Sequence, residues 1–411
     1  MPASHVKKAA DKNLLLFYAF CIKIKQIARQ ETSIFLLCVF IRALSALKTK
    51  GDDFMFPNPV AKIKNFALIL SFLLSMASFI VSVIIMIKQS FEQGLIALSV
   101  GAGINLATIG LLYLIAFMVE RIMAQALIKN FLQRPDINKA YAMVDESDPW
   151  YATIKKVHDS LGEITAREHR TVEIKSLDGL TLRGVYYPQK GAYKTVICVH
   201  GYTSHAEREW AYPGLYYLSL GYNVLIPYQR AHGLSEGNYI TLGALERDDL
   251  TLWVKKALEL SDGGDVVIHG LSMGGGIALL ATPFEMEGVK AVIADAPSTS
   301  VRTTFENVAK HAFKTDGEKI GALAIKIFGK RFNVDVDTCD VLTAVKEGKY
   351  PVLLAAGSNE NLEGLFQSIA DINPKPTKTV ILPGCDHGNG LYKQTELFKK
   401  AIADFLTECG L

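Results

Sequence analysis

The chain has 411 residues, half of them hydrophobic, and a formal net charge of +3. This length accommodates more than one domain, and so small a charge argues against a protein that binds nucleic acid through a basic surface. The six cysteines are scattered, without the spacing of a zinc site or of a disulfide framework.

The first 64 residues form a basic N-terminal extension in which lysine and arginine interrupt short apolar runs. These runs are too short to cross a bilayer, so two interpretations stay open. The segment is either an amphipathic stretch on a membrane surface or a poorly ordered extension. Met55 offers a second start for the chain, and the sequence leaves open whether residues 1–54 belong to the native protein.

Two uncharged apolar segments follow, at 66–87 and 95–119. A helix of 22 residues is about 33 Å long, which is enough to cross the hydrocarbon core of a bilayer. Because only seven residues separate the two segments, we expect an antiparallel transmembrane hairpin over residues 65–120.

Small residues recur at helical spacing in both segments, and such residues let helices approach closely in lipid. We expect the two stripes to face each other. Their members are Ser71, Ser75, Ser78 and Ser82 in the first segment, and Ser99, Gly103, Ala107 and Gly110 in the second.

Basic residues flank the open end of the hairpin. Lys64 precedes the first segment and Arg121 and Lys129 follow the second, whereas the short turn contains only Lys88. Because lysine and arginine accumulate on the cytoplasmic side of a membrane, we expect an integral membrane protein with two spans and a cytoplasmic C-terminal part. Residues 121–165 predict a helical connector.

From residue 166 onwards, short apolar runs alternate with helical segments. "TVEIKSLDGLTLRGVYYP" predicts two strands around an Asp-Gly turn. Later runs such as "KTVICV", "DVVIH" and "TKTVIL" predict buried strands of a mostly parallel sheet with helices on both faces. We therefore expect an α/β fold over residues 166–411, with residues 297–348 forming a helical lid.

Residues 270–274 form the motif G-x-S-x-G between an expected strand and an expected helix. The chain must turn sharply there, so that the Ser272 hydroxyl projects above the sheet as a nucleophile. A serine needs a base and an acid that orients it. His387 follows the last expected strand, and Glu360 follows the strand before it. Asp295, which also ends a strand, is the alternative acid.

The oxyanion that forms during acyl transfer needs two backbone amides as hydrogen-bond donors. Met273, directly after the serine, is the first expected donor. Tyr202, in the loop after "KTVICV", is the second, and the preceding Gly201 lets the backbone approach closely.

These motifs, with the blocks "HGYTSH", "YQRAHGLSEGNYITLGALERDDL" and "ADAPSTS", resemble the α/β-hydrolase superfamily. The resemblance covers residues 166–411 and is strongest to esterase/lipase-like and prolyl-oligopeptidase-like serine hydrolases. It implies an α/β-hydrolase fold with a helical lid and a Ser-His-acid triad. Glu360 stands where relatives more often have aspartate, and the family block D-x-R-G-H-G appears here as YQRAHG at residues 228–233.

The sequence therefore predicts a membrane-anchored serine hydrolase, most simply a carboxylic ester hydrolase that works through an acyl-enzyme without a metal or organic cofactor. A small-molecule or lipid ester is the expected substrate, because the hairpin keeps the site near a membrane. The alternatives are a serine peptidase with the same triad and a catalytically silent binding or scaffold protein. A hairpin that regulates the hydrolase is a further option. The oligomeric state and the membrane concerned stay open.

Overall fold

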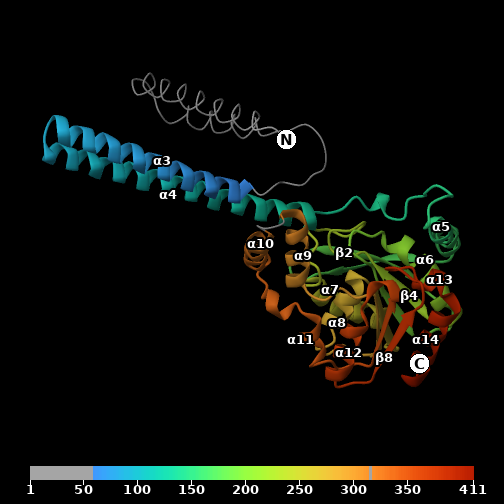
Figure 1. Cartoon of the computed structure of the whole chain (residues 1–411). Helices are drawn as coiled ribbons and strands as arrows, with labels where there is room; N and C mark the ends of the chain where they lie inside the picture. The colour runs from blue at the N-terminus through green and yellow to red at the C-terminus, as the bar shows by residue number, and fades with distance from the viewer. Residues whose placement is uncertain (1–58, 314–316) are drawn as a thin grey trace. The chain divides into compact units, whose positions relative to one another are not determined.

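The computed structural model describes residues 59–313 and 317–411 (Figure 1). The predicted N-terminal extension, including Met55, therefore lies outside the described residues up to position 58. Helices α3 (Pro59–Lys88) and α4 (Phe91–Leu132) pack against each other as a helical hairpin. Both are long and apolar enough to cross a membrane.

The hairpin is tighter at its turn and longer at its other end than the sequence indicated. Only Gln89 and Ser90 separate the two helices. The Ser90 hydroxyl accepts a hydrogen bond from the Gln93 amide (3.2 Å) and so caps α4. At its far end α4 continues past residue 120, the predicted end of the hairpin, to Leu132. Its 42 residues correspond to about 63 Å of helix.

The serine stripe of α3 faces α4, but the stripe predicted for α4 was wrong. Its four members are exposed, namely Ser99, Gly103, Ala107 and Gly110. Instead, Gly101 lies against Ser78, and the Asn105 side chain donates hydrogen bonds to the Ser75 hydroxyl and to the backbone of α3. Gly101 and Gly103 lie about 200° apart around a helix, so only one of these two glycine-containing faces can contact α3. The face with Gly101 and Asn105 makes this contact.

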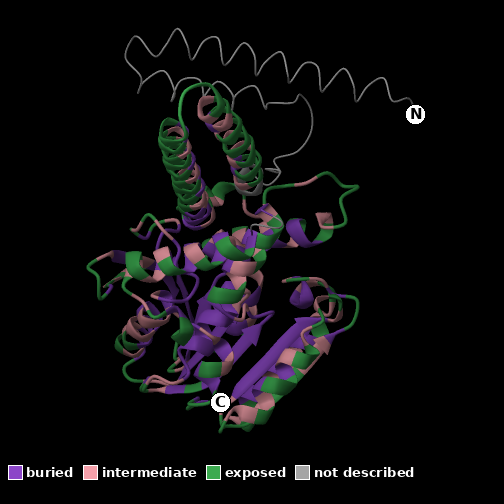
Figure 2. Cartoon of the chain, turned by 60° about the vertical axis from the view of Figure 1, so that its left-hand side comes forward, coloured by how far each residue is buried: buried purple, intermediate pink, exposed green. Residues whose placement is uncertain are grey.

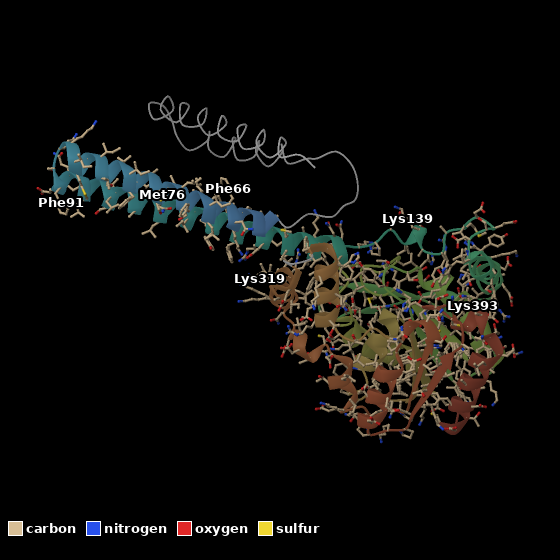
Figure 3. The ribbon with its side chains drawn as sticks, viewed as in Figure 1. Phe66, Met76, Phe91, Lys139, Lys319 and Lys393 are labelled. Atoms are coloured by element: carbon tan, nitrogen blue, oxygen red, sulfur yellow. The ribbon has the colours of Figure 1, made fainter. Side chains whose placement is uncertain are left out.

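The outer surface of the hairpin is apolar. Phe66, Met76 and Phe91, labelled in Figure 3, have 56%, 47% and 71% of their surface exposed. At the base of the hairpin, Lys64 pairs with Glu120 at 2.7 Å. A continuous apolar surface of this kind is typical of helices that contact lipid or another protein.

The C-terminal part contains one sheet of eight strands in the order β1-β2-β4-β3-β5-β6-β7-β8. Strands β3 to β8 are parallel, and β1 and β2 add an antiparallel hairpin at one edge. The predicted fold class is thus confirmed. The strands are β1 (Arg170–Lys175), β2 (Thr181–Tyr187), β3 (Thr195–Val199), β4 (Asn223–Pro227), β5 (Val266–Leu271), β6 (Val289–Asp295), β7 (Val352–Gly357) and β8 (Thr377–Leu382).

Helices cover both faces of this sheet, and Figure 2 shows the buried strands between helices with exposed outer sides. In β3, Ile197 and Val199 enter one hydrophobic core, whereas Val196 and Cys198 enter the other, because successive side chains of a strand point to opposite faces. The helices are α5 (Tyr151–Thr165), α6 (Ala206–Ser219), α7 (Glu246–Leu260), α8 (Met273–Leu280), α9 (Val301–Phe313), α10 (Gly317–Phe332), α11 (Val341–Val345), α12 (Glu363–Ile372), α13 (Gly390–Lys393) and α14 (Thr395–Glu408).

The first of these cores also includes the end of α4. Ile128 and Leu132 of this helix are fully buried in it, together with residues of α7 to α12. The second core contains residues of α5, α6 and α14. The segment predicted as a lid is helical in its described part, where α9 and α10 pack against each other and α10 packs against α4. The connector after residue 120 therefore begins as part of the core of the C-terminal part.

Candidate active site

Ser272 lies in the turn between β5 and α8, with a φ of 58° that is uncommon for a residue with a side chain. The backbone packs so closely here that only glycine fits on either side. A Cβ atom on Gly274 would lie 1.9 Å from the Val199 carbonyl oxygen, and one on Gly270 would lie 2.1 Å from the Gly274 carbonyl oxygen. This turn places Ser272 at the carboxyl edge of the parallel strands.

His387 and Glu360 reach Ser272 from two neighbouring loops. β7 and β8 are adjacent and parallel, so the loops that follow them meet at the same edge of the sheet. His387 Nε2 is 2.8 Å from Ser272 Oγ, and His387 Nδ1 is 2.5 Å from Glu360 Oε2. The other Glu360 oxygen accepts a hydrogen bond from the Gly357 amide (2.9 Å), which fixes the carboxylate. The structure thus brings these three predicted residues into one hydrogen-bonded row.

The two loops are also bound to each other. Asp386 accepts a hydrogen bond from the Asn359 side chain (2.8 Å) and pairs with Lys393 (3.0 Å), which is labelled in Figure 3. The hydrogen bond from Asn359, together with those from Lys393 and Asn389, lowers the pKa of Asp386 to about 2. Asp386 therefore stays charged and holds the His387 loop against the Glu360 loop.

The carboxylate of Glu360 also sets the proton affinity of the histidine. Its hydrogen bond raises the pKa of His387 above the ordinary value, although partial burial of the ring acts in the opposite direction. The imidazolium form is thereby stabilised, as a base that accepts a proton from serine requires. Because 58% of the His387 side-chain surface is exposed, a substrate can approach it.

Asp295, the alternative acid, does not join this row. It ends β6 with 8% of its surface exposed, and its backbone carbonyl accepts the Ser272 amide (2.8 Å). Burial, reinforced by the nearby Glu360 carboxylate, raises the pKa of Asp295 to about 8. A carboxyl group that is largely protonated at neutral pH is poorly suited to stabilise an imidazolium ion.

The two predicted oxyanion donors lie next to the serine. Gly201 packs against Ser272, since an added Cβ atom would lie 3.4 Å from Ser272 Cβ. The Tyr202 amide that follows has no backbone acceptor among residues 59–313 and 317–411. The Met273 amide belongs to the first turn of α8, where N–H groups have no partner within the helix. Both amides can therefore donate to an oxyanion on a substrate bound at Ser272.

The sequence reasoning missed a buried carboxyl group beneath the Tyr202 loop. Glu209 Oε1 accepts the Gly201 amide (2.8 Å), and Glu209 Oε2 accepts a hydrogen bond from the Tyr141 hydroxyl (3.3 Å). Burial raises the pKa of Glu209 to about 7. Its only sequence signal was its place in the first turn of α6, where acidic residues are common because of the helix dipole.

His200, at the start of the same loop, acts as a structural hydrogen-bonding residue. Its Nδ1 lies 2.8 Å from the Gly201 carbonyl oxygen, and its Nε2 accepts the Gln229 amide (3.1 Å). Burial, together with the adjacent His232, holds the pKa of His200 well below the ordinary value. The ring is therefore neutral and fixes the loop that carries Tyr202.

Comparisons with known proteins agree with this architecture. Residues 191–342 match the protein family described as "Serine aminopeptidase, S33". The chain is 34% identical over 142 residues to YqkD, an uncharacterised protein of Bacillus subtilis (strain 168). That match covers 34% of this chain and 46% of YqkD, so it spans less than half of the relative's length.

Solved structures of two esterases and of a proline iminopeptidase are among those similar to this chain. The esterase Pf2001 of Pyrococcus furiosus is 24% identical, covers 67% of this chain and 98% of its own, and gives a TM-score of 0.47. Est1E of Butyrivibrio proteoclasticus, solved with ferulic acid, is 23% identical, covers 58% of this chain and 98% of its own, and gives a TM-score of 0.47. The proline iminopeptidase of Mycobacterium smegmatis is 15% identical, covers 58% of this chain and 98% of its own, and gives a TM-score of 0.44.

The sheet order, the turn at Ser272 and the family match together assign the fold. The match extends over the serine and the loop of Tyr202. Glu360 and His387 lie beyond it in the chain, in the loops that follow β7 and β8 of the same sheet. The C-terminal part of the chain therefore has an α/β-hydrolase fold.

Proposed function

We propose that this chain is a serine hydrolase that cleaves an ester or related acyl bond through an acyl-enzyme. The observation that carries the proposal is the 2.8 Å contact between His387 Nε2 and Ser272 Oγ, with Glu360 on the opposite ring nitrogen. In this arrangement the histidine can take the serine proton while the carboxylate stabilises the resulting positive charge.

The reaction proceeds in two halves. Ser272 Oγ attacks the carbonyl carbon as its proton passes to His387, and the oxyanion accepts hydrogen bonds from the Tyr202 and Met273 amides. When the tetrahedral intermediate collapses, His387 protonates the departing alkoxide, and the acyl group stays on Ser272. Water then attacks the acyl-enzyme and gives a proton to His387. As the bond between the acyl carbon and Ser272 Oγ breaks, His387 returns this proton to Oγ, and the carboxylic acid leaves.

An ester substrate is favoured over a peptide with a free amino terminus. An aminopeptidase needs a fixed negative charge for the α-ammonium group of its substrate. Two carboxyl groups near His387, those of Glu209 and Asp295, are buried, and their pKa values are raised to about 7 and about 8. The charged carboxylate of Asp386 is already paired with Lys393. The name of the matching family keeps an aminopeptidase as the second candidate. Parallel assays with p-nitrophenyl esters and aminoacyl p-nitroanilides distinguish the two.

We also propose that the hairpin spans a membrane twice, with the hydrolase domain on the cytoplasmic side. The exposed apolar side chains of α3 and α4 support the spans. Arg121 and Lys129 on the open side, against Lys88 alone in the turn, support the orientation. A membrane-proximal small-molecule or lipid ester would then be the substrate.

Fluorophosphonate labelling of the full-length protein in detergent tests the proposed nucleophile. Labelling should disappear in Ser272→Ala and fall by roughly 10⁴-fold or more in His387→Ala, because the serine loses its base. Glu360→Gln should lower the labelling rate strongly, whereas the matched change Asp295→Asn should keep most of the wild-type labelling rate. Labelling that survives in Ser272→Ala would contradict the proposal. A folded wild-type protein that does not react would favour the silent scaffold.

The labelling rate should also depend on pH in a defined direction. Only neutral His387 accepts a proton, so the rate should rise with pH, with a midpoint above the ordinary histidine value of about 6.5. Glu360→Gln should move this midpoint to lower pH, because the imidazolium loses its carboxylate partner. The measurement is the rate constant of labelling over a pH range from about 5 to 9. A midpoint unaffected by Glu360→Gln would show that Glu360 does not set the histidine pKa.

Antibody access in intact and permeabilised cells tests the orientation. A short epitope tag between Gln89 and Ser90 should be detected without permeabilisation, because the turn lies on the far side of the membrane. A tag after Leu411 should be detected only after permeabilisation. The reverse pattern would overturn the cytoplasmic placement, and access to both tags in intact cells would contradict a two-span hairpin.

A further inference from the structure

The last turn of α4 is bonded to the residue that supplies the second oxyanion donor. The Tyr202 hydroxyl donates a hydrogen bond to the Phe131 carbonyl, and the two ring centroids are 5.0 Å apart. Within a continuing helix the Phe131 carbonyl would accept the amide of residue 135, but this residue is Pro135 and has no N–H group. The Tyr202 phenol therefore takes the place of the missing donor.

The end of α4 is fixed to the hydrolase domain at further points. The Ile240 amide donates to the Leu132 carbonyl (2.7 Å), and the Arg134 amide donates to the Asn238 carbonyl (2.9 Å). The Arg134 guanidinium also donates to the Ser235 carbonyl (2.7 Å). These bonds leave the last turn of α4 little freedom, so a side chain attached to it is held firmly.

The same turn contacts the lid helices. The Phe131 ring lies 6.3 Å from that of Phe305 in α9, which in turn lies 5.3 Å from that of Phe328 in α10, measured between centroids. Phe305 and Phe328 are fully buried. Tyr202 is thus the first member of an aromatic row that continues through α4 into the lid.

The loop that carries Tyr202 needs such anchoring. The next residue, Thr203, has a φ of 52°, which is a strained conformation for a β-branched side chain. Strained backbone persists only where its surroundings hold it in place. Contacts that do so here include the bond from Tyr202 to Phe131, the bond from the Gly201 amide to Glu209 and the contact of His200 with the Gly201 carbonyl.

We propose that the last turn of α4 is a positioning element of the active site. It holds the Tyr202 side chain so that the Tyr202 amide faces the oxyanion, and it thereby links the hairpin directly to the rate of acyl transfer. This inference rests on the proposed function, because it concerns the oxyanion donor of that reaction. Tyr202 acts through its amide, and its phenol serves only to place that amide.

Steady-state kinetics of the full-length protein in detergent test the inference. Tyr202→Phe keeps the ring and the amide but removes the bond to α4. We expect kcat for a p-nitrophenyl ester to fall about tenfold with KM nearly unchanged, less than the loss of a whole oxyanion donor, because the amide is displaced rather than removed. Phe131→Ala, which removes the ring contact, should lower kcat in the same way.

Tyr216→Phe is the matched control. The Tyr216 phenol likewise donates to a backbone carbonyl, that of Lys399 in α14 (2.9 Å), on the opposite face of the sheet. The control should keep the wild-type kcat, and the melting temperatures of Tyr202→Phe and Tyr216→Phe should fall by similar amounts. Wild-type kcat in Tyr202→Phe, or equal losses of kcat in both variants, would overturn the inference alone. A folded wild-type protein that neither labels nor turns over esters would overturn the proposed function, and the inference with it.

Discussion

The structure of this site depends on a backbone approach that only glycine allows. Gly274 brings α8 so close to the end of β3 that any Cβ atom would collide with the Val199 carbonyl oxygen. In the same turn Ser272 has a φ of 58° and precedes Met273, the first residue of α8, so the serine and the Met273 amide lie together at the start of a helix. The nucleophile and one oxyanion donor are therefore set by the same turn.

The remaining groups reach this turn because the strands are parallel. Loops after β3, β7 and β8 all open at one edge of the sheet, so Tyr202, Glu360 and His387 converge although they are far apart in the chain. Buried or charged side chains then fix these loops. Glu209 holds the first loop through the Gly201 amide, and Asp386 joins the other two.

Much of this arrangement could be predicted from the sequence, because strand ends and a G-x-S-x-G turn are local patterns with a known place in a parallel sheet. The features that were missed depend on tertiary packing. Nothing in the local pattern distinguishes Glu209 from other acids at helix starts, or selects the Gly101 face of α4 over the Gly103 face. The contact between Phe131 and Tyr202 joins segments that are distant in the chain. Its one sequence signal was Pro135, which has no N–H group to donate to the Phe131 carbonyl.

In the proposed reaction, Ser272 carries the acyl group between the two halves. Trapping that intermediate is the most direct test. Full-length protein mixed with an excess of p-nitrophenyl acetate is quenched in acid, digested and analysed by mass spectrometry. We expect a burst of p-nitrophenol and an acetyl group on Ser272, with no adduct at position 272 in Ser272→Ala. A burst in the wild type without an acetyl group on Ser272, or turnover of the ester by Ser272→Ala at the wild-type rate, would contradict the proposed reaction.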